Sequence, residues 1–139
     1  MLPLTSTWQR VEPLEEAESM RMLDSVRWAR CAWNGPEGPR ILPVNHWVLD
    51  GSVFFRTALY GSLVEAANGQ AVALEADELD DSLSSGWSVV VLGSAEQVED
   101  PAEAAALFGR LGQPWAPGSR PVLVRISPSK VTGRRFLRD

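Results

Sequence analysis

The chain has 139 residues, of which 45% are hydrophobic and 22% charged, so it is long enough for one hydrophobic core and too apolar for a disordered chain. A net charge of −5 argues against a nucleic-acid-binding protein, and Cys31 as the single cysteine excludes an internal disulfide or a thiolate metal site. Met1–Trp8 does not resemble a secretory signal, and no apolar run reaches the roughly 18 residues of a membrane span. We therefore expect one cytoplasmic domain over residues 1–139, with residues 1–10 as an N-terminal extension, and no nucleic-acid or membrane partner.

The first half of the chain predicts one helix followed by three strands. Pro13–Asp24 combines an early proline, acidic residues in its first turn and apolar residues every three positions. Two apolar segments then flank the turn cluster Gly35–Pro39. Asp50-Gly51 lies between two apolar runs and is a strong indication of a tight hairpin. The three expected strands are Arg27–Trp33, Arg40–Leu49 and Ser52–Thr57.

The second half predicts further strands and two short helices. Ser62 and Glu65 have the spacing of a capping box, and Asp100-Pro101 is typical of a helix start. The expected elements are a helix over Ser62–Asn68, a strand over Ala71–Ala76, an acidic loop over Asp77–Ser85, a strand over Trp87–Val98, a helix over Asp100–Arg110, a loop over Gly112–Arg120 and a strand over Pro121–Ser127. Roughly six antiparallel strands with short helices indicate a mainly β fold, namely a small β-barrel.

The usual catalytic groups are sparse. A Cys-His pair would need Cys31 and His46, but Cys31 lies in the middle of a strand, where a buried inert thiol is expected. No G-x-S-x-G motif occurs. Four acids of one loop could in principle bind a metal, yet they lack an EF-hand pattern and are typical of a solvated turn: Asp77, Glu78, Asp80 and Asp81. We therefore expect no metal.

The segment from Val53 to Leu63 has the composition of a phosphate site. Arg56 offers a forked cation, Thr57 and Ser62 offer hydroxyl groups, and a helix is expected to start beside them. The alternative is that Arg56 is a surface residue and Ser62 only caps the helix. The residues alone leave both interpretations open.

Three segments in this order carry a resemblance: "LPVNHWVLDGSVFFRTALYGSLVEAANGQAVALEAD", "GWSVVVLGSAEQVEDPAE" and "PWAPGSRPVLVRISPSKVTGRRF". From Leu14 to Phe136 the chain resembles the pyridoxamine 5′-phosphate oxidase-like split-barrel flavoproteins, especially a small actinobacterial-type branch related to nitroimidazole-resistance proteins. The resemblance implies an FMN-binding split barrel that forms a homodimer, with FMN in a groove between the subunits.

The resemblance also implies which residues contact FMN. The phosphate is expected at Arg56–Leu63, and the ring at Pro43–Asn45, at Phe54–Thr57 and, from the other subunit, near Trp87. The resulting cofactor-binding residues are Pro43, Val44, Asn45, Phe55, Arg56, Thr57, Ser62, Leu63 and Trp87, while catalytic residues stay unassigned. The expected function is an FMN-dependent oxidoreductase acting on an unidentified small molecule.

One position departs from the family pattern. Many relatives carry "RTAPGTKL", whereas this chain has "RTALYGSLV", with Leu63 at the lysine position. Loss of a charge-assisted contact to phosphate costs about 1.5–3 kcal/mol. The alternative function is therefore a non-catalytic or stress-associated split-barrel binding protein that has lost FMN or binds a deazaflavin or haem.

Three further residues could meet a ligand. His46 could contact a flavin edge or donate a proton, but a structural role in its strand is favoured. Arg125 and Arg134 could meet an anionic substrate or phosphate, and each is more often a surface charge.

Overall fold

A computed structural model describes residues 9–58, 61–80, 82, 85–111 and 121–138. Strands dominate this part of the chain. The elements are β1 (Arg10–Leu14), α1 (Glu16–Ser25), β2 (Trp28–Gly35), β3 (Gly38–Leu49), β4 (Ser52–Thr57), the 3-10 helix η1 (Ser62–Ala66), β5 (Asn68–Glu78), β6 (Ser85–Gln97), α2 (Pro101–Arg110) and β7 (Val122–Leu137). The predicted loop over 112–120 lies outside the described residues.

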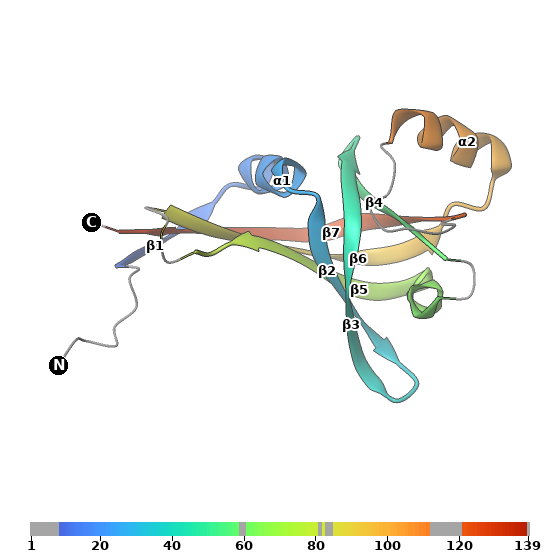
Figure 1. Cartoon of the computed structure of the whole chain (residues 1–139), viewed down its shortest axis with the longest axis horizontal. Coiled ribbons are helices and arrows are strands. Elements are labelled where there is room, and N and C mark those ends of the chain that lie inside the picture. The colour runs from blue at the N-terminus through green and yellow to red at the C-terminus, as the bar shows by residue number, and fades with distance from the viewer. Residues whose placement is uncertain (1–8, 59–60, 81, 83–84, 112–120, 139) are drawn as a thin grey trace.

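The strands form one antiparallel sheet that closes on itself. Their order is β1-β7-β4-β3-β2-β5-β6, and β7 also pairs with β6. Figure 1 shows β7 running the length of the molecule, with β1 beside its C-terminal end. This partially closed ring confirms the predicted mainly β split barrel. It has seven strands instead of about six, because β1 was not predicted.

The predicted Asp50-Gly51 hairpin is confirmed, and the turn cluster Gly35–Pro39 closes a second hairpin. Asp50 and Gly51 adopt φ values of 51° and 78°, so this turn takes the left-handed conformation that matches the twist of the flanking strands β3 and β4. The β2–β3 hairpin closes where Gly35 pairs with Gly38, and it projects from the barrel in Figure 1.

The prediction that Pro13 starts the first helix was wrong. Pro13 pairs with Arg134 in β1, and α1 begins at Glu16. A proline is tolerated here because β1 lies at the edge of the sheet order, where its missing N–H removes no essential hydrogen bond. Helix α1 then packs against β7, β6 and β3, and its Leu23 is fully buried.

The prediction that Ser62 and Glu65 form a capping box was also wrong. Gly61 occupies the N-cap position with extended backbone angles, no side-chain cap bond forms, and the helix is a 3-10 turn that ends at Ala66. Ser62 therefore lies inside the turn instead of capping it. By contrast, the Asp100 carboxylate does cap α2, accepting a hydrogen bond from the N–H of Ala102 at 3.2 Å.

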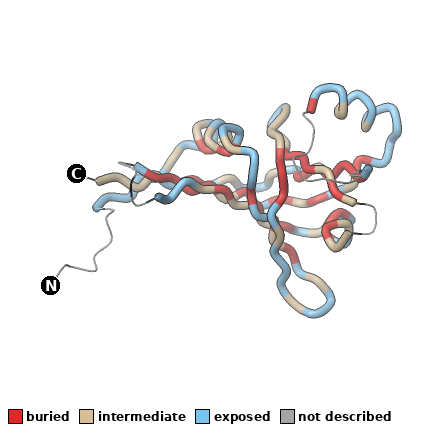
Figure 2. Tube along the Cα trace, viewed as in Figure 1, coloured by how far each residue is buried: buried red, intermediate tan, exposed pale blue. Residues whose placement is uncertain are grey.

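Two apolar clusters hold these elements together. The larger fills the barrel, and Figure 2 shows its buried residues as continuous red stretches along the central strands. The smaller joins α2 to the outer side of β4 and β7 through Phe54, Val98, Leu111 and Leu123. None of the helices described is long and apolar enough to cross a membrane.

Ring closure depends on a close approach between β6 and β7. The register shifts at Leu92/Gly93, and a Cβ at Gly93 would lie 2.2 Å from the carbonyl oxygen of Ser127. We predict that Gly93→Ala lowers the free energy of unfolding by about 1–3 kcal/mol, measured by urea denaturation, because backbone must move.

Gly109→Ala is the matched control. A Cβ there meets nothing within 4 Å, and Gly109 lies inside α2, so the same substitution should leave stability unchanged or raise it by up to about 1 kcal/mol. Equal destabilisation by both substitutions would contradict this account of the closure.

Candidate functional site

A pocket of about 230 Å³ opens where the end of β4 and the start of η1 meet the middle of β3 and the start of β2. It brings together segments far apart in the sequence. Its lining residues are Trp28, Leu42, Pro43, Val44, Asn45, Arg56, Thr57, Ala58, Gly61, Ser62 and Leu63. Seven of the nine predicted cofactor-binding residues are therefore gathered around one pocket.

The other two predicted residues lie elsewhere. Phe55 is fully buried in the barrel core, on the opposite face of β4 from Phe54. Trp87 is only 7% exposed within the core of its own chain, and its indole Nε1–H donates to Glu78 Oε1 at 3.3 Å. Neither side chain lines the pocket of its own chain, and the predicted contact of Trp87 from the other subunit stays a prediction.

Trp28 and Leu42 line the pocket although neither was predicted, whereas Ala58 and Gly61 belong to the predicted phosphate segment Arg56–Leu63. Trp28 had a detectable pattern, because it alternates in β2 with the buried residues Ala29 and Cys31 and so shares the exposed face with Arg30. Its side chain is 42% exposed. A large aromatic residue on the solvent-exposed face of a strand is a useful indication of a ligand or subunit contact.

Arg56 is the only charged residue among the described residues that line the pocket. It belongs to β4, where it pairs with Leu123 of β7. Its guanidinium carbon lies 4.4 Å from the ring centroid of Phe108 in α2, which is a close cation–π contact. The one charged side chain that the described lining residues contribute thus also contacts the ring of a residue in a neighbouring helix.

The donor set beside Arg56 suits a small anion. Thr57 and Ser62 contribute hydroxyl groups, and Thr57 is 6% exposed. A Cβ at Gly61 would lie 3.5 Å from Thr57 Oγ1 and 3.4 Å from the Ala58 carbonyl oxygen, so any side chain there would take up pocket space. One guanidinium and two hydroxyls next to a glycine are the types of donor that bind a phosphate group.

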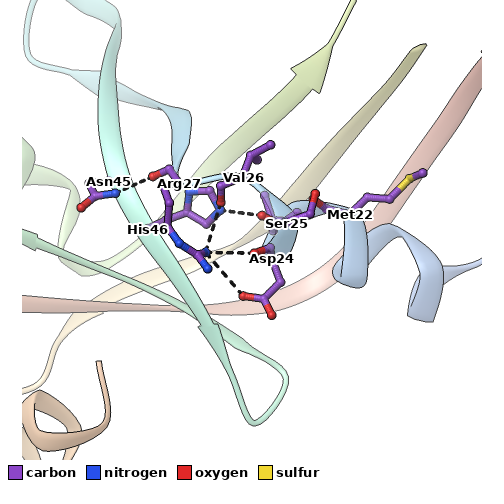
Figure 3. Close-up of polar contacts among 8 residues, drawn as sticks. Met22, Asp24, Ser25, Val26, Arg27, Asn45 and His46 are labelled. Carbon is purple, nitrogen blue, oxygen red and sulfur yellow. Dashed lines mark hydrogen bonds and ion pairs between the residues drawn. The ribbon is translucent and has the colours of Figure 1, made fainter. Parts of the chain in front are cut away.

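The inner wall is fixed by Asn45 and His46. Asn45 Nδ2–H donates to the Arg27 carbonyl oxygen at 2.6 Å, and the His46 backbone N–H donates to the same oxygen at 3.0 Å. Figure 3 shows these residues at the junction of α1 and β2, where the Arg27 guanidinium also turns back to Asp24. Asn45 is therefore oriented before any ligand binds.

His46 lies behind the pocket, not in it. Its ring is fully buried, and Nε2–H donates to the Leu23 carbonyl oxygen at 2.8 Å. Burial lowers the pKa of His46, although the bond to Leu23 partly opposes this. The neutral ring ties α1 to β3, which is the structural role favoured by the sequence.

A second hollow of about 520 Å³ adjoins the pocket and shares Trp28 and Pro43 with it. Beside it, Arg30 Nη1 lies 3.2 Å from Glu75 Oε1 and 3.4 Å from Asp77 Oδ2. Burial, together with the hydrogen bond and charge of Asp77, raises the pKa of Glu75 to about 7. The Glu75 and Asp77 carboxyl groups therefore both lie beside the guanidinium of Arg30.

The remaining candidate cations and acids form local pairs. Arg125 contacts Glu103 at 2.7 Å, and Arg134 lies over the ring of Phe136. Neither arginine lines the pocket. Of the acidic loop, Asp80 accepts from Ser82, and Asp81 lies outside the described residues. Within the described part of the chain, no three His, Cys, Asp or Glu side chains gather as metal ligands would.

Cys31 is fully buried in β2, and burial raises the pKa of its thiol to about 12. We predict that the native protein does not react with Ellman's reagent at pH 8, whereas the protein unfolded in guanidinium releases one equivalent of thionitrobenzoate. Rapid reaction of the native protein would show that the thiol is accessible.

Comparison with known proteins agrees with the fold. The pyridoxamine 5′-phosphate oxidase family matches residues 15–135. An uncharacterized Mycobacterium tuberculosis protein is 41% identical over 136 residues, covering 94% of this chain and 89% of that protein. A solved Mycobacterium smegmatis structure, named as an FAD-binding protein, is 35% identical with a TM-score of 0.75, covering 89% of this chain and 97% of the other.

A Corynebacterium glutamicum structure, named as a candidate pyridoxamine 5′-phosphate oxidase, is 33% identical with a TM-score of 0.77, and the match covers 93% of this chain and 95% of that one. The family match extends from the start of α1 to the C-terminal part of β7 and so includes every strand that builds the pocket. The chain belongs to the pyridoxamine 5′-phosphate oxidase family.

Proposed function

We propose that this protein binds a flavin in the 230 Å³ pocket and acts, as a homodimer, as a flavin-dependent oxidoreductase on a small molecule. The observation that carries the proposal is the meeting of two distant segments, Pro43–Asn45 and Arg56–Leu63, around one pocket. These are the segments at which the family resemblance places the ring and the phosphate of FMN. The flavin-binding relative from Mycobacterium smegmatis supports the same class of ligand.

The residues present fit the two ends of FMN. Arg56, Thr57 and Ser62 would bind the phosphate, while Trp28 and Pro43 offer flat apolar surfaces for a ring. When bound, the flavin supplies the hydride and electron transfer. The protein's own contribution is to bind the phosphate, orient the ring and exclude water with the apolar wall formed by Leu42, Val44 and Leu63.

FAD is the second candidate cofactor. It is favoured by the name of the relative that shares 35% of its residues with this chain. It is also favoured by the adjoining 520 Å³ hollow, which gives a longer ligand further surface beyond Trp28. FMN is the preferred cofactor because the described lining of the pocket offers one arginine, which suits the single phosphate group of FMN.

The direct test is a fluorescence titration of the purified protein with FMN. We expect quenching at micromolar concentrations and an approximately ten- to hundredfold weaker dissociation constant for Arg56→Gln, because a charged hydrogen bond to phosphate is lost. Arg21→Gln, an exposed arginine on α1 away from the pocket, should bind like the wild type.

Unchanged FMN fluorescence and a colourless protein would contradict the proposal. A Soret band after addition of haem would support the alternative binding-protein function instead. Tighter binding of FAD than of FMN would support the flavin function, with FAD instead of FMN as the cofactor.

The proposed dimer uses the outer face of the sheet. Ile41, Ala32, Ala73 and Leu92 pair directly with one another across β3, β2, β5 and β6. Ile41 is 61% exposed and Leu92 is 42% exposed, and the other three residues of the row, Ala32, Ala73 and Leu92, line a shallow hollow of about 370 Å³. An apolar row of this kind needs a covering surface, and the family resemblance implies that a second copy provides it.

We predict that Leu92→Glu converts the dimer to a monomer in size-exclusion chromatography with light scattering. Lys130 pairs opposite Leu92, so the monomer should tolerate a glutamate there. Leu79→Glu introduces the same charge at an exposed leucine outside this row and should leave the dimer intact. A monomeric wild type would contradict the proposed assembly.

A further inference from the structure

We propose that Phe108 of α2 is a positioning residue for the flavin phosphate, acting through the Arg56 guanidinium. This inference rests on the proposed flavin function and assigns a role to a helix that does not itself line the pocket. Its basis is the 4.4 Å separation between the Arg56 guanidinium carbon and the Phe108 ring centroid.

Helix α2 contacts the sheet through one apolar cluster and two ion pairs, although none of its residues is fully buried. Phe108 packs on the apolar cluster that contains Phe54 of β4 and Leu123 of β7. Glu103 at the start of α2 pairs with Arg125 at 2.7 Å, and Arg110 at its end pairs with Asp50 in the β3–β4 turn at 3.1 Å. Together these contacts place the Phe108 ring against β4 and β7, beside Arg56.

A guanidinium carries five N–H donors in a planar fork, and its contact with an aromatic ring is electrostatic and does not depend on a particular donor. A contact with the Phe108 ring and hydrogen bonds to a phosphate can therefore form together. A long arginine side chain otherwise loses considerable rotamer freedom on binding. Fixing it beforehand reduces that loss and strengthens phosphate binding without adding a contact to the ligand.

The departure at Leu63 increases the importance of this arrangement. Many relatives have a lysine at this position, whereas Leu63 is 9% exposed and belongs to the barrel core. Arg56 is then the only charged residue among the described residues of the pocket lining. Phosphate affinity should therefore depend strongly on the position of Arg56.

A double-mutant cycle tests the coupling. Dissociation constants for FMN and for riboflavin, which lacks the phosphate, are measured for the wild type, Phe108→Leu, Arg56→Gln and the double variant. We expect Phe108→Leu to reduce the preference for FMN over riboflavin by about three- to tenfold. In the Arg56→Gln background it should change this preference by less than twofold.

The ratio of two ligands on one protein sample also controls for folding, because a misfolded fraction lowers both occupancies equally. Phe108→Tyr keeps an aromatic face and should behave like the wild type. Additive effects in the cycle, or equal weakening of FMN and riboflavin by Phe108→Leu, would overturn the role of Phe108 while leaving flavin binding intact. Absence of binding of either flavin to the wild type would contradict the proposed function itself, and this inference with it.

Discussion

The structure depends on one strand that pairs with three others. β7 joins β4 through its first five residues, β6 along most of its length and β1 through its C-terminal end, and this pairing turns an open sheet into a closed ring. Because Thr57 at the end of β4 pairs with Val122 at the start of β7, the same contact fixes the edge of the pocket. Helix α2 connects β6 to β7, so ring closure also brings Phe108 to Arg56.

The pocket combines rigid surroundings with little charge. Asn45 is held by the Arg27 carbonyl group, Trp28 starts the strand that follows α1, and Arg56 is stacked on Phe108. A protein that recognises phosphate with one arginine gains affinity mainly by holding that arginine in place. Under the proposed flavin function, this arrangement offsets the leucine that occupies the position of the usual lysine.

Local patterns in the sequence predicted the parts of the fold that local chemistry determines. The Asp50-Gly51 turn and the Asp100 cap involve neighbouring residues only, and both are present. β1 was missed because its pairing partner lies more than a hundred residues away, and Pro13 resembles a helix start when that partner is ignored. The position of Phe108 could not be predicted for the same reason, since its contact with Arg56 depends on how α2 packs against the closed barrel. The family resemblance predicted most of the residues that line the pocket. Because side chains alternate along a strand, however, Phe55 lies in the core, and Trp28, which was not predicted, lines the pocket.

The most direct measurement of the central claim is a crystal structure of the protein with FMN bound. The account predicts the phosphate within hydrogen-bonding distance of the Arg56 guanidinium and of the Thr57 or Ser62 hydroxyl, with the ring against Trp28 and Pro43 and the Arg56–Phe108 stack retained. A phosphate bound away from Arg56, for example beside Arg134 near the end of β7, would contradict it.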